Sequence, residues 1–313
     1  MPGTGGPRAC RATARPAPGV ADNARMSLSP ARLDPATRSP LRLLALETST
    51  DTLSVAVGPG TPERPVRPHT GPGGAQASAT LLPVVQTLLA QAGWALHELD
   101  ALVFGRGPGS FTGLRTACAV AQGLAYGVRG AGRAGGIPVL PVDTLHALAE
   151  EARWQREQAG QSLPGVIVAL LDARMDEMYV ALYACGPQGL AIAPLQPQRL
   201  CAPAELGGYL RQSLPPALSL EAGDCLLAGN VFDAYGAQFS DLPGARQRAL
   251  PTASALLRLA PALLAAGHAV AAQDALPLYV RDKVAQTTAE REQLRLDHLA
   301  RLAAPTPTDP LGA

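Results

Sequence analysis

Blocks of apolar residues alternate with polar ones along the chain, and their spacing predicts an α/β fold that begins near residue 41. The apolar runs from Leu43 to Leu46 and from Leu53 to Val57 flank a polar turn, which is typical of two paired strands. From Leu81 to Ala92 the apolar residues recur at helical spacing. Strand patterns and helix patterns then continue in alternation, as expected for sheets that are covered by helices.

The opening pattern recurs further along the chain. Glu47 is followed five positions later by TLSVAV, and Asp172 is followed five positions later by EMYVAL, an offset of 125 residues. A repeat of this kind predicts two duplicated α/β subdomains. We place them at residues 41–146 and 147–285, between a disordered leader at 1–40 and a flexible tail at 286–313.

Composition narrows the class of protein. The chain has 313 residues, of which 47% are hydrophobic, enough for one large core or two modest ones. Its formal net charge of +1 gives no global attraction to nucleic acid or to a membrane surface. The five cysteines are far apart and form no C-x-x-C pair, which favours reduced thiols over a disulfide framework or a zinc site. Since no clean apolar run reaches about 20 residues, we expect a cytoplasmic protein without membrane contact.

The stretch GRGPGSFTGLR lies between a predicted strand and a predicted helix, so it is a glycine-rich turn. Gly107 and Gly109 permit close backbone approach, and the helix that follows begins with unpaired N–H groups that can bind an anion. The turn is no P-loop, because Leu114 and Arg115 stand where Lys-Ser/Thr would be. Two interpretations follow, namely phosphate binding and close packing of the turn.

The turn ETSTD is the other candidate phosphate site. Glu47, Thr48 and Ser49 follow an apolar strand, and their hydroxyls and backbone can bind phosphate while the carboxylate lies near a metal ion. Asp172 occupies the matching turn of the second half. The alternative is a polar hairpin tip without a ligand, which is the commoner use of such residues.

Small residues form a stripe on the helix after the glycine turn. Gly113, Ala117, Ala121 and Ala125 recur every four positions, so they share one face that another helix can approach closely. That face packs against the chain's own sheet in one interpretation and against a partner subunit in the other. The five histidines are scattered and form no i, i+4 pair, so the sequence predicts no metal site.

Six motifs, in this order, resemble the TsaB family, which is also called YeaZ: LLALETSTDTLSVAV, GRGPGSFTGLR, QGLAYG, IPVLPVDTLHALA, LDARMDEMYVALY and PLYVRDKVA. They are spread over most of residues 41–285. The resemblance implies an actin/sugar-kinase/Hsp70-like (ASKHA) fold, with two duplicated α/β subdomains that contain mixed sheets.

The resemblance also implies a role in forming N6-threonylcarbamoyladenosine next to the anticodon of tRNAs that read A-starting codons. In that family TsaB is a non-catalytic scaffold and activator of its relative TsaD, the ATPase TsaE joins them, and tRNA is reached only through the complex. TsaD binds a metal ion with H-x-x-x-H, and Thr144 and Leu148 stand at the positions we align with those histidines. We therefore expect no catalytic or metal-binding residue and no required cofactor, with weak ATP or ADP binding at the partner interface left open.

Family members pair with TsaD, or with a second copy of themselves, through a four-helix bundle. The resemblance implies a partner interface on the helix after residue 80 and the helix after the glycine turn, made by Leu81, Val85, Leu88, Gly113, Ala117, Ala121 and Ala125. The main alternative function is a stand-alone ATP-dependent transferase or kinase of the same fold, with ETSTD and DARMDE as its phosphate turns. A glycoprotease, which would need a zinc motif, is the third hypothesis.

Overall fold

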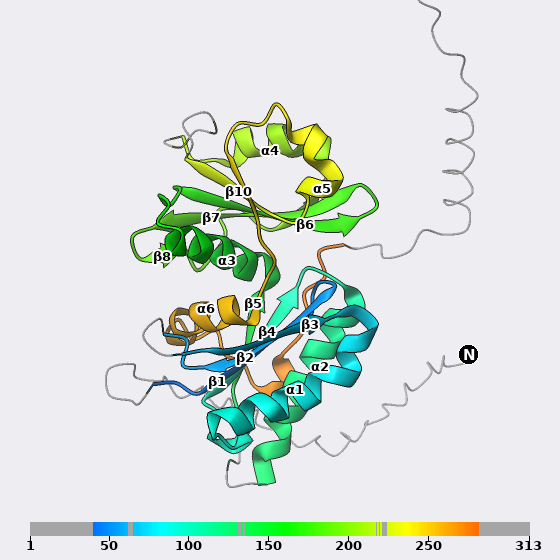
Figure 1. Ribbon diagram of the computed structural model, residues 1–313, viewed down its shortest axis with the longest axis vertical. Coiled ribbons are helices and arrows are strands. Elements are labelled where there is room, and N and C mark those ends of the chain that lie inside the picture. The colour runs from blue at the N-terminus through cyan, green and yellow to red at the C-terminus, as the bar shows by residue number, and fades with distance from the viewer. Residues whose placement is uncertain are drawn as a thin grey trace, which may run out of the picture. The chain divides into compact units, whose positions relative to one another are not determined.

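The computed structural model describes residues 40–61, 65–130, 133, 135–216, 218, 220 and 224–281. The predicted flexible tail, and all of the predicted leader except Pro40, lie outside these residues. The described part contains two β-sheets, each covered by helices (Figure 1).

The first sheet has five strands in the order β3-β2-β1-β4-β5. These strands are β1 (Leu43–Glu47), β2 (Thr52–Gly58), β3 (Arg67–Pro72), β4 (Ala101–Gly107) and β5 (Val139–Asp143). Strand β1 pairs antiparallel with β2 and parallel with β4, and β4 pairs parallel with β5. The sheet is therefore mixed, and the two strands predicted around the polar turn are confirmed.

Strand β3 lies in a stretch that does not have the sequence of a strand. Its residues are RPHTGP, and both Pro68 and Pro72 pair with residues of β2. Proline cannot donate a ladder hydrogen bond, so it is confined to edge strands, where its outer side needs no partner. The position of β3 at the edge of the sheet explains why a segment with two prolines can form a strand there.

Helices cover both faces of the first sheet. Successive side chains of β1 point to opposite faces, since a strand has a period of two. Leu44 and Leu46 pack under α1 (Ala77–Ala92) and α2 (Phe111–Gly127), whereas Leu43 and Ala45 pack against α6 (Ala253–Ala265). The sheet is thus buried on both sides, and α1 and α2 form one outer layer (Figure 1).

The second sheet repeats the topology of the first. Its strands are β6 (Val166–Arg174), β7 (Glu177–Gly186), β8 (Gly189–Leu190), β9 (Arg199–Cys201), β10 (Cys225–Gly229) and β11 (Ala245–Arg248). Strand β6 pairs antiparallel with β7 and parallel with β10, while β7 pairs antiparallel with β9 and β10 pairs parallel with β11. The strand order β9-β7-β6-β10-β11 therefore matches β3-β2-β1-β4-β5, and each pair of neighbours has the same parallel or antiparallel direction in both sheets. This match confirms the predicted duplication.

The helices of the second half differ from the predicted division of the chain. Helix α3 (Thr144–Gln158) covers one face of the second sheet, and α4 (Leu206–Ser213) and α5 (Phe232–Tyr235) cover the other. The boundary predicted after residue 146 falls inside α3, and α6, predicted in the second subdomain, packs on the first sheet. Among the described residues, each helix is too short or insufficiently apolar to span a bilayer.

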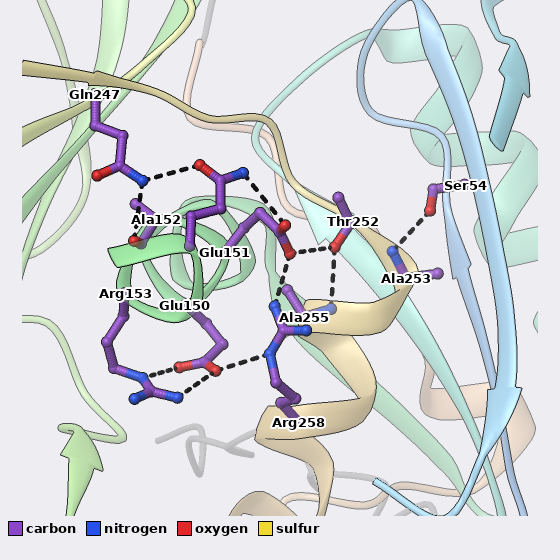
Figure 2. A network of polar contacts seen from close by, with 11 residues as sticks. Ser54, Glu150, Glu151, Ala152, Arg153, Gln247, Thr252, Ala253, Ala255 and Arg258 are labelled. Atoms are coloured by element: carbon purple, nitrogen blue, oxygen red, sulfur yellow. Dashed lines mark hydrogen bonds and ion pairs between the residues drawn. The ribbon is translucent and has the colours of Figure 1, made fainter. Parts of the chain in front are cut away.

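Helices α3 and α6 join the two sheets through a buried polar network (Figure 2). The Arg258 guanidinium contacts two carboxylates, with Nε 2.9 Å from Glu150 Oε1 and Nη2 2.6 Å from Glu151 Oε2. Arg153 donates two further hydrogen bonds to Glu150, and the Thr252 hydroxyl donates to Glu151 Oε2 at 2.8 Å. These charges are buried, and each has an opposite charge as its partner.

Two further hydrogen bonds connect the network to the sheets (Figure 2). The Ala253 N–H donates to Ser54 Oγ of β2 at 2.9 Å, and Gln247 Nε2 of β11 donates to the Ala152 carbonyl at 3.1 Å. Each sheet is therefore linked by hydrogen bonds to the α3–α6 pair.

Candidate functional site

The first predicted phosphate turn is largely enclosed by the protein. Glu47, Thr48 and Ser49 are all buried. Burial raises the pKa of Glu47, because a buried site disfavours the charged form of a carboxyl group. The hydrogen bond that Oε1 accepts from the Ser49 N–H at 2.7 Å opposes this effect but does not outweigh it. The Thr48 hydroxyl donates to the Gly113 carbonyl at 2.7 Å. These polar groups thus hold the turn against the start of α2.

The glycine-rich turn packs directly on that first turn. A Cβ atom on Gly109 would lie 2.6 Å from the Ser49 carbonyl oxygen, and one on Gly107 would lie 2.4 Å from the Leu278 carbonyl oxygen. The Ser110 N–H donates to the Ser49 carbonyl at 2.7 Å, so it is not free to bind a phosphate. Of the two interpretations of this turn, the geometry supports close packing.

Asp172 lies at the matching turn of the second sheet and has partners of its own. Its Oδ1 accepts hydrogen bonds from the Arg174 N–H at 2.9 Å and from the Tyr235 hydroxyl at 3.2 Å. Its own N–H donates to Asn230 Oδ1 at 2.9 Å. The carboxylate therefore stabilises its own hairpin, and only part of its hydrogen-bonding capacity is left for a ligand.

The two duplicated turns border one cleft of about 220 Å³. Three of the predicted residues line it, namely Ser49, Gly109 and Asp172, whereas Glu47, Thr48 and Gly107 do not. An ion pair spans the cleft, with Arg174 Nη2 2.9 Å from Asp51 Oδ2. The structure thus brings half of the predicted phosphate residues to one place.

Size and charge decide what this cleft can hold. Its volume is below the roughly 300–1,000 Å³ of ordinary small-molecule sites. Its lining includes two carboxylates, Asp51 and Asp172, and one guanidinium, Arg174, so its formal charge is negative. A nucleoside triphosphate is anionic and larger than such a space, so the cleft does not fit one unless Asp51 and Arg174 separate.

The positions aligned with metal-binding histidines lie at the start of α3. Thr144 and Leu148 are fully buried. His146 lies between them, and its ring stacks on Tyr183 with the centroids 4.6 Å apart. Burial lowers the pKa of His146 to about 4, so its imidazole is neutral at neutral pH. Within the described ranges, no three side chains of His, Cys, Asp or Glu gather as metal ligands would.

The seven residues predicted as a partner interface are buried in the chain's own first core. All of them belong to the inner faces of α1 and α2: Leu81, Val85, Leu88, Gly113, Ala117, Ala121 and Ala125. A Cβ atom on Gly113 would lie 1.8 Å from the Thr48 carbonyl oxygen, so this end of the stripe must face inward. Four-residue spacing shows that residues share a face but not which way it points. The small-residue stripe is therefore used for internal packing.

A second stripe of small residues lies on the outer side of α2. Ala119, Gly123 and Gly127 are exposed, and a Cβ atom on either glycine would meet nothing within 4 Å. On α1, Leu82 is 44% exposed and Gln86 is also exposed. We call the outer side of these two helices the docking face.

The docking face is unusually poor in charge. Helix α1 has 16 residues and helix α2 has 17, and Arg115 is the one charged residue in the two helices. In the whole chain 16% of residues are charged. Depletion of charge at a surface is typical of the core of a protein–protein interface, whereas ordinary exposed helices carry many charges.

Sequence reasoning missed the C-terminal segment, residues 275–281, as a part of this region. The Leu278 N–H donates to the Arg106 carbonyl at 2.7 Å, and Arg281 Nη2 lies 2.8 Å from Glu177 Oε2. Tyr279 contacts Phe111 at the start of α2, with the ring centroids 5.1 Å apart. The signal was present in the motif PLYVR, but its contacts join residues more than 100 positions apart, which no local pattern reveals.

Two mixed sheets of the same topology, joined by a pair of central helices, define an α/β protein of the actin/sugar-kinase/Hsp70-like class. A family model described as "TsaD: tRNA N6-adenosine threonylcarbamoyltransferase" matches residues 73–289. The chain belongs to the TsaB family, also called YeaZ.

The matches with two of its relatives extend over nearly the whole length of those proteins. Over 257 residues the chain is 32% identical to "tRNA threonylcarbamoyladenosine biosynthesis protein TsaB" of Haemophilus influenzae, covering 78% of this chain and 95% of the relative. The protein of the same name in Escherichia coli is 33% identical over 258 residues, with 78% and 96% covered. The solved structure of YeaZ from Pseudomonas aeruginosa is 35% identical, with a TM-score of 0.61 over 76% of this chain and 99% of that chain.

Proposed function

We propose that this chain acts in the formation of N6-threonylcarbamoyladenosine next to the anticodon of tRNAs that read A-starting codons. Its role is that of a scaffold subunit that binds and activates a TsaD homologue, with a TsaE-type ATPase joining the pair. The names of its relatives support the pathway. The observation that carries the scaffold role is the docking face, which has the composition of an interface core.

The docking face has the geometry to receive helices from a partner. Ala119, Gly123 and Gly127 recur every four residues, so they present one smooth strip along α2. Side chains this small let a second helix approach at the short end of the usual range of about 8–10 Å between axes. With a pair of partner helices, α1 and α2 would form a four-helix bundle.

The catalytic groups are expected to come from the partner. Thr144 and Leu148 carry an alcohol and an alkyl side chain, and neither replaces the imidazole of a metal-binding histidine. The cleft between the duplicated turns offers a negative charge and about 220 Å³, which is poorly suited to ATP. In this proposal tRNA is reached only through the complex, and nucleotide turnover belongs to the ATPase.

A reconstituted transfer reaction tests the proposal. The cognate TsaD homologue, the ATPase and the enzyme that forms the threonylcarbamoyl adenylate are incubated with tRNA, with and without this chain. We expect modification only when the chain is present, and no ATP hydrolysis or tRNA modification by the chain alone. Equal modification without the chain, or ATP turnover by the purified chain, would refute the scaffold role and favour a stand-alone ATP-dependent enzyme.

A matched pair of variants tests the surface itself. Gly123→Arg places a long charged side chain on the docking face, where the Cβ position is open, so the monomer is expected to fold. Gly208→Arg makes the same change at an exposed, equally open position of α4. Analytical ultracentrifugation with the TsaD homologue should show loss of association for Gly123→Arg alone. Unchanged association of Gly123→Arg would remove the docking face from the proposal.

A further inference from the structure

Two arginines lie along one border of the docking face, and each is stacked on an aromatic ring. The Arg115 guanidinium carbon lies 3.8 Å from the Phe111 ring centroid, and Nε donates to the Tyr279 hydroxyl at 3.2 Å. The Arg129 guanidinium carbon lies 4.3 Å from the Tyr126 ring centroid. We call these five residues the arginine edge. The three rings are 37%, 60% and 41% exposed for Phe111, Tyr126 and Tyr279, so the edge is accessible.

Neither arginine forms an ion pair within the described part of the chain. Arg129 Nε is buried and has no hydrogen-bond partner, and its Nη2 makes one long contact of 3.4 Å with Gln273. Residues 65–97 and 101–142, which surround the two arginines in the sequence, contain no Asp or Glu. Asp274 follows Gln273 in the chain but forms no ion pair with Arg129. Two cations at the border of a neutral surface are thus without an ion-pair partner in the described part of the chain.

The aromatic rings hold these cations in fixed positions. A guanidinium stacked on a ring loses less side-chain freedom on binding than a free one, because part of the ordering has already taken place. Arginine and tyrosine, with tryptophan, are also enriched among the residues that dominate interface energies. Residues 115 and 126 are 11 positions apart, which is three helical turns, so both stacks lie on the same side of α2.

We propose that the arginine edge binds carboxylates of the protein partner that occupies the docking face. Arg115 receives one acidic side chain and Arg129 a second. The two arginines are 14 positions apart, so the partner's carboxylates are about 20 Å apart, or about four turns along a helix. The inference rests on the proposed function, since it names the chemistry that the partner presents to the same surface.

The charge pattern favours a protein over RNA as the occupant. A protein that follows a nucleic-acid backbone neutralises several phosphates with closely spaced Lys and Arg. Between Arg115 and Arg129 the outer side of α2 instead presents Ala119, Gly123 and Gly127, which are uncharged and small. Two isolated cations at the ends of a neutral strip suit a helix with two acidic residues.

Charge reversal tests the proposal. We would measure the affinity of Arg115→Glu, Arg129→Glu and the double variant for the TsaD homologue by titration calorimetry at low and high salt. Each single variant is expected to bind at least about tenfold more weakly at low salt. The double variant should bind more tightly as salt is raised, because its new carboxylates repel those of the partner and salt screens that repulsion. Arg211→Glu, at an exposed arginine of α4, is the control and should bind within twofold of the unmodified chain. Circular dichroism confirms that each variant is folded.

Two additional arms complete the experiment. Arg115→Lys keeps the charge but not the planar stack on Phe111, so it should recover only part of the affinity. Replacing the partner's acidic residue by arginine should restore binding to Arg115→Glu, because the pair is then re-formed with its signs exchanged. A failure of every acidic residue on the partner's bundle helices to show this compensation would count against the inference.

The outcomes separate this inference from the proposed function. If both arginine variants bind the TsaD homologue within twofold while Gly123→Arg does not bind, the docking face stands and the carboxylate recognition is wrong. If Gly123→Arg also binds normally, both are wrong. If the arginine variants assemble normally but the complex loses affinity for tRNA, the arginine edge contacts RNA and the inference is overturned.

Discussion

Replacing Arg258 by methionine tests how firmly the two halves of the molecule are joined. The guanidinium contacts Glu150 at 2.9 Å and Glu151 at 2.6 Å, and the side chains are 16%, 5% and 10% exposed, respectively. Methionine keeps most of the apolar stem and removes the charge. Glu150 would retain its two hydrogen bonds from Arg153, but Glu151 would keep only uncharged donors such as the Thr252 hydroxyl.

The expected loss follows from what remains buried. Removing one partner of a buried ion pair costs about 3–5 kcal/mol, because the remaining charge stays desolvated. Only Glu151 loses its cation here, so we expect the free energy of unfolding to fall by about 3 kcal/mol. This is a large part of the roughly 5–15 kcal/mol that stabilises a folded domain. The double variant that adds Glu151→Gln should recover part of this loss, since it removes the isolated charge.

Urea unfolding followed by circular dichroism measures the free energy of unfolding. Arg248→Met is the matched control, because Arg248 pairs with Asp233 at the surface, where the side chains are 70% and 66% exposed. An exposed pair contributes about 0–1 kcal/mol. If Arg258→Met loses no more than this control, the network in Figure 2 does not join the halves, and the reasoning from burial is refuted.

Two further predictions concern single sites. Gly113→Ala should destabilise the protein by about 1–3 kcal/mol, since its Cβ atom would lie 1.8 Å from the Thr48 carbonyl oxygen. Gly123→Ala has open space at Cβ, so it should be neutral or stabilise the protein by up to about 1 kcal/mol. Thermal melts that rank the two variants in the opposite order would contradict this prediction. The pKa of His146 is about 4 in the folded state and about 6.5 when unfolded, so the unfolded state binds more protons in this window and stability falls as the pH is lowered. Between pH 7 and pH 5 the free energy of unfolding of the unmodified chain should fall by about 2 kcal/mol more than that of the His146→Phe variant, measured by urea unfolding. Parallel pH profiles of the two proteins would show that His146 is not buried in its neutral form.

The alternation of apolar and polar residues predicted much of the sheet structure but not the partners of each element. Strands β1 and β2 and the repeat at Asp172 follow from local patterns, because the period of a strand is written in consecutive residues. Helix α6 has apolar residues on several sides, so its sequence fits against either sheet. Its place on the first sheet depends on contacts such as Ala253 with Ser54, which are 199 positions apart. Such pairings are set by the fold as a whole.

The same limit explains the small residues of α2. Two stripes with a four-residue spacing run along this helix, one through Ala117 and one through Ala119, and either could face a partner. The contact of Gly113 with the Thr48 carbonyl, together with the burial of Ala117, Ala121 and Ala125, shows that the first stripe points inward. The spacing therefore predicted a close-packed face of small residues, while the direction of that face depended on a contact between the helix and a distant turn.

That contact also accounts for the glycine-rich turn. Gly109 and Gly113 let the start of α2 lie directly on the backbone of Ser49 and Thr48, and a side chain at either position would force the two apart. The position of α2 fixes Phe111 and Arg115 in turn, so the close packing of the turn determines where the arginine edge lies on the surface. A change at Gly109 should then weaken partner binding as well as stability, without touching the partner. The turn resembles a phosphate loop because both need glycines for close backbone approach, but here the approaching group is the protein's own backbone.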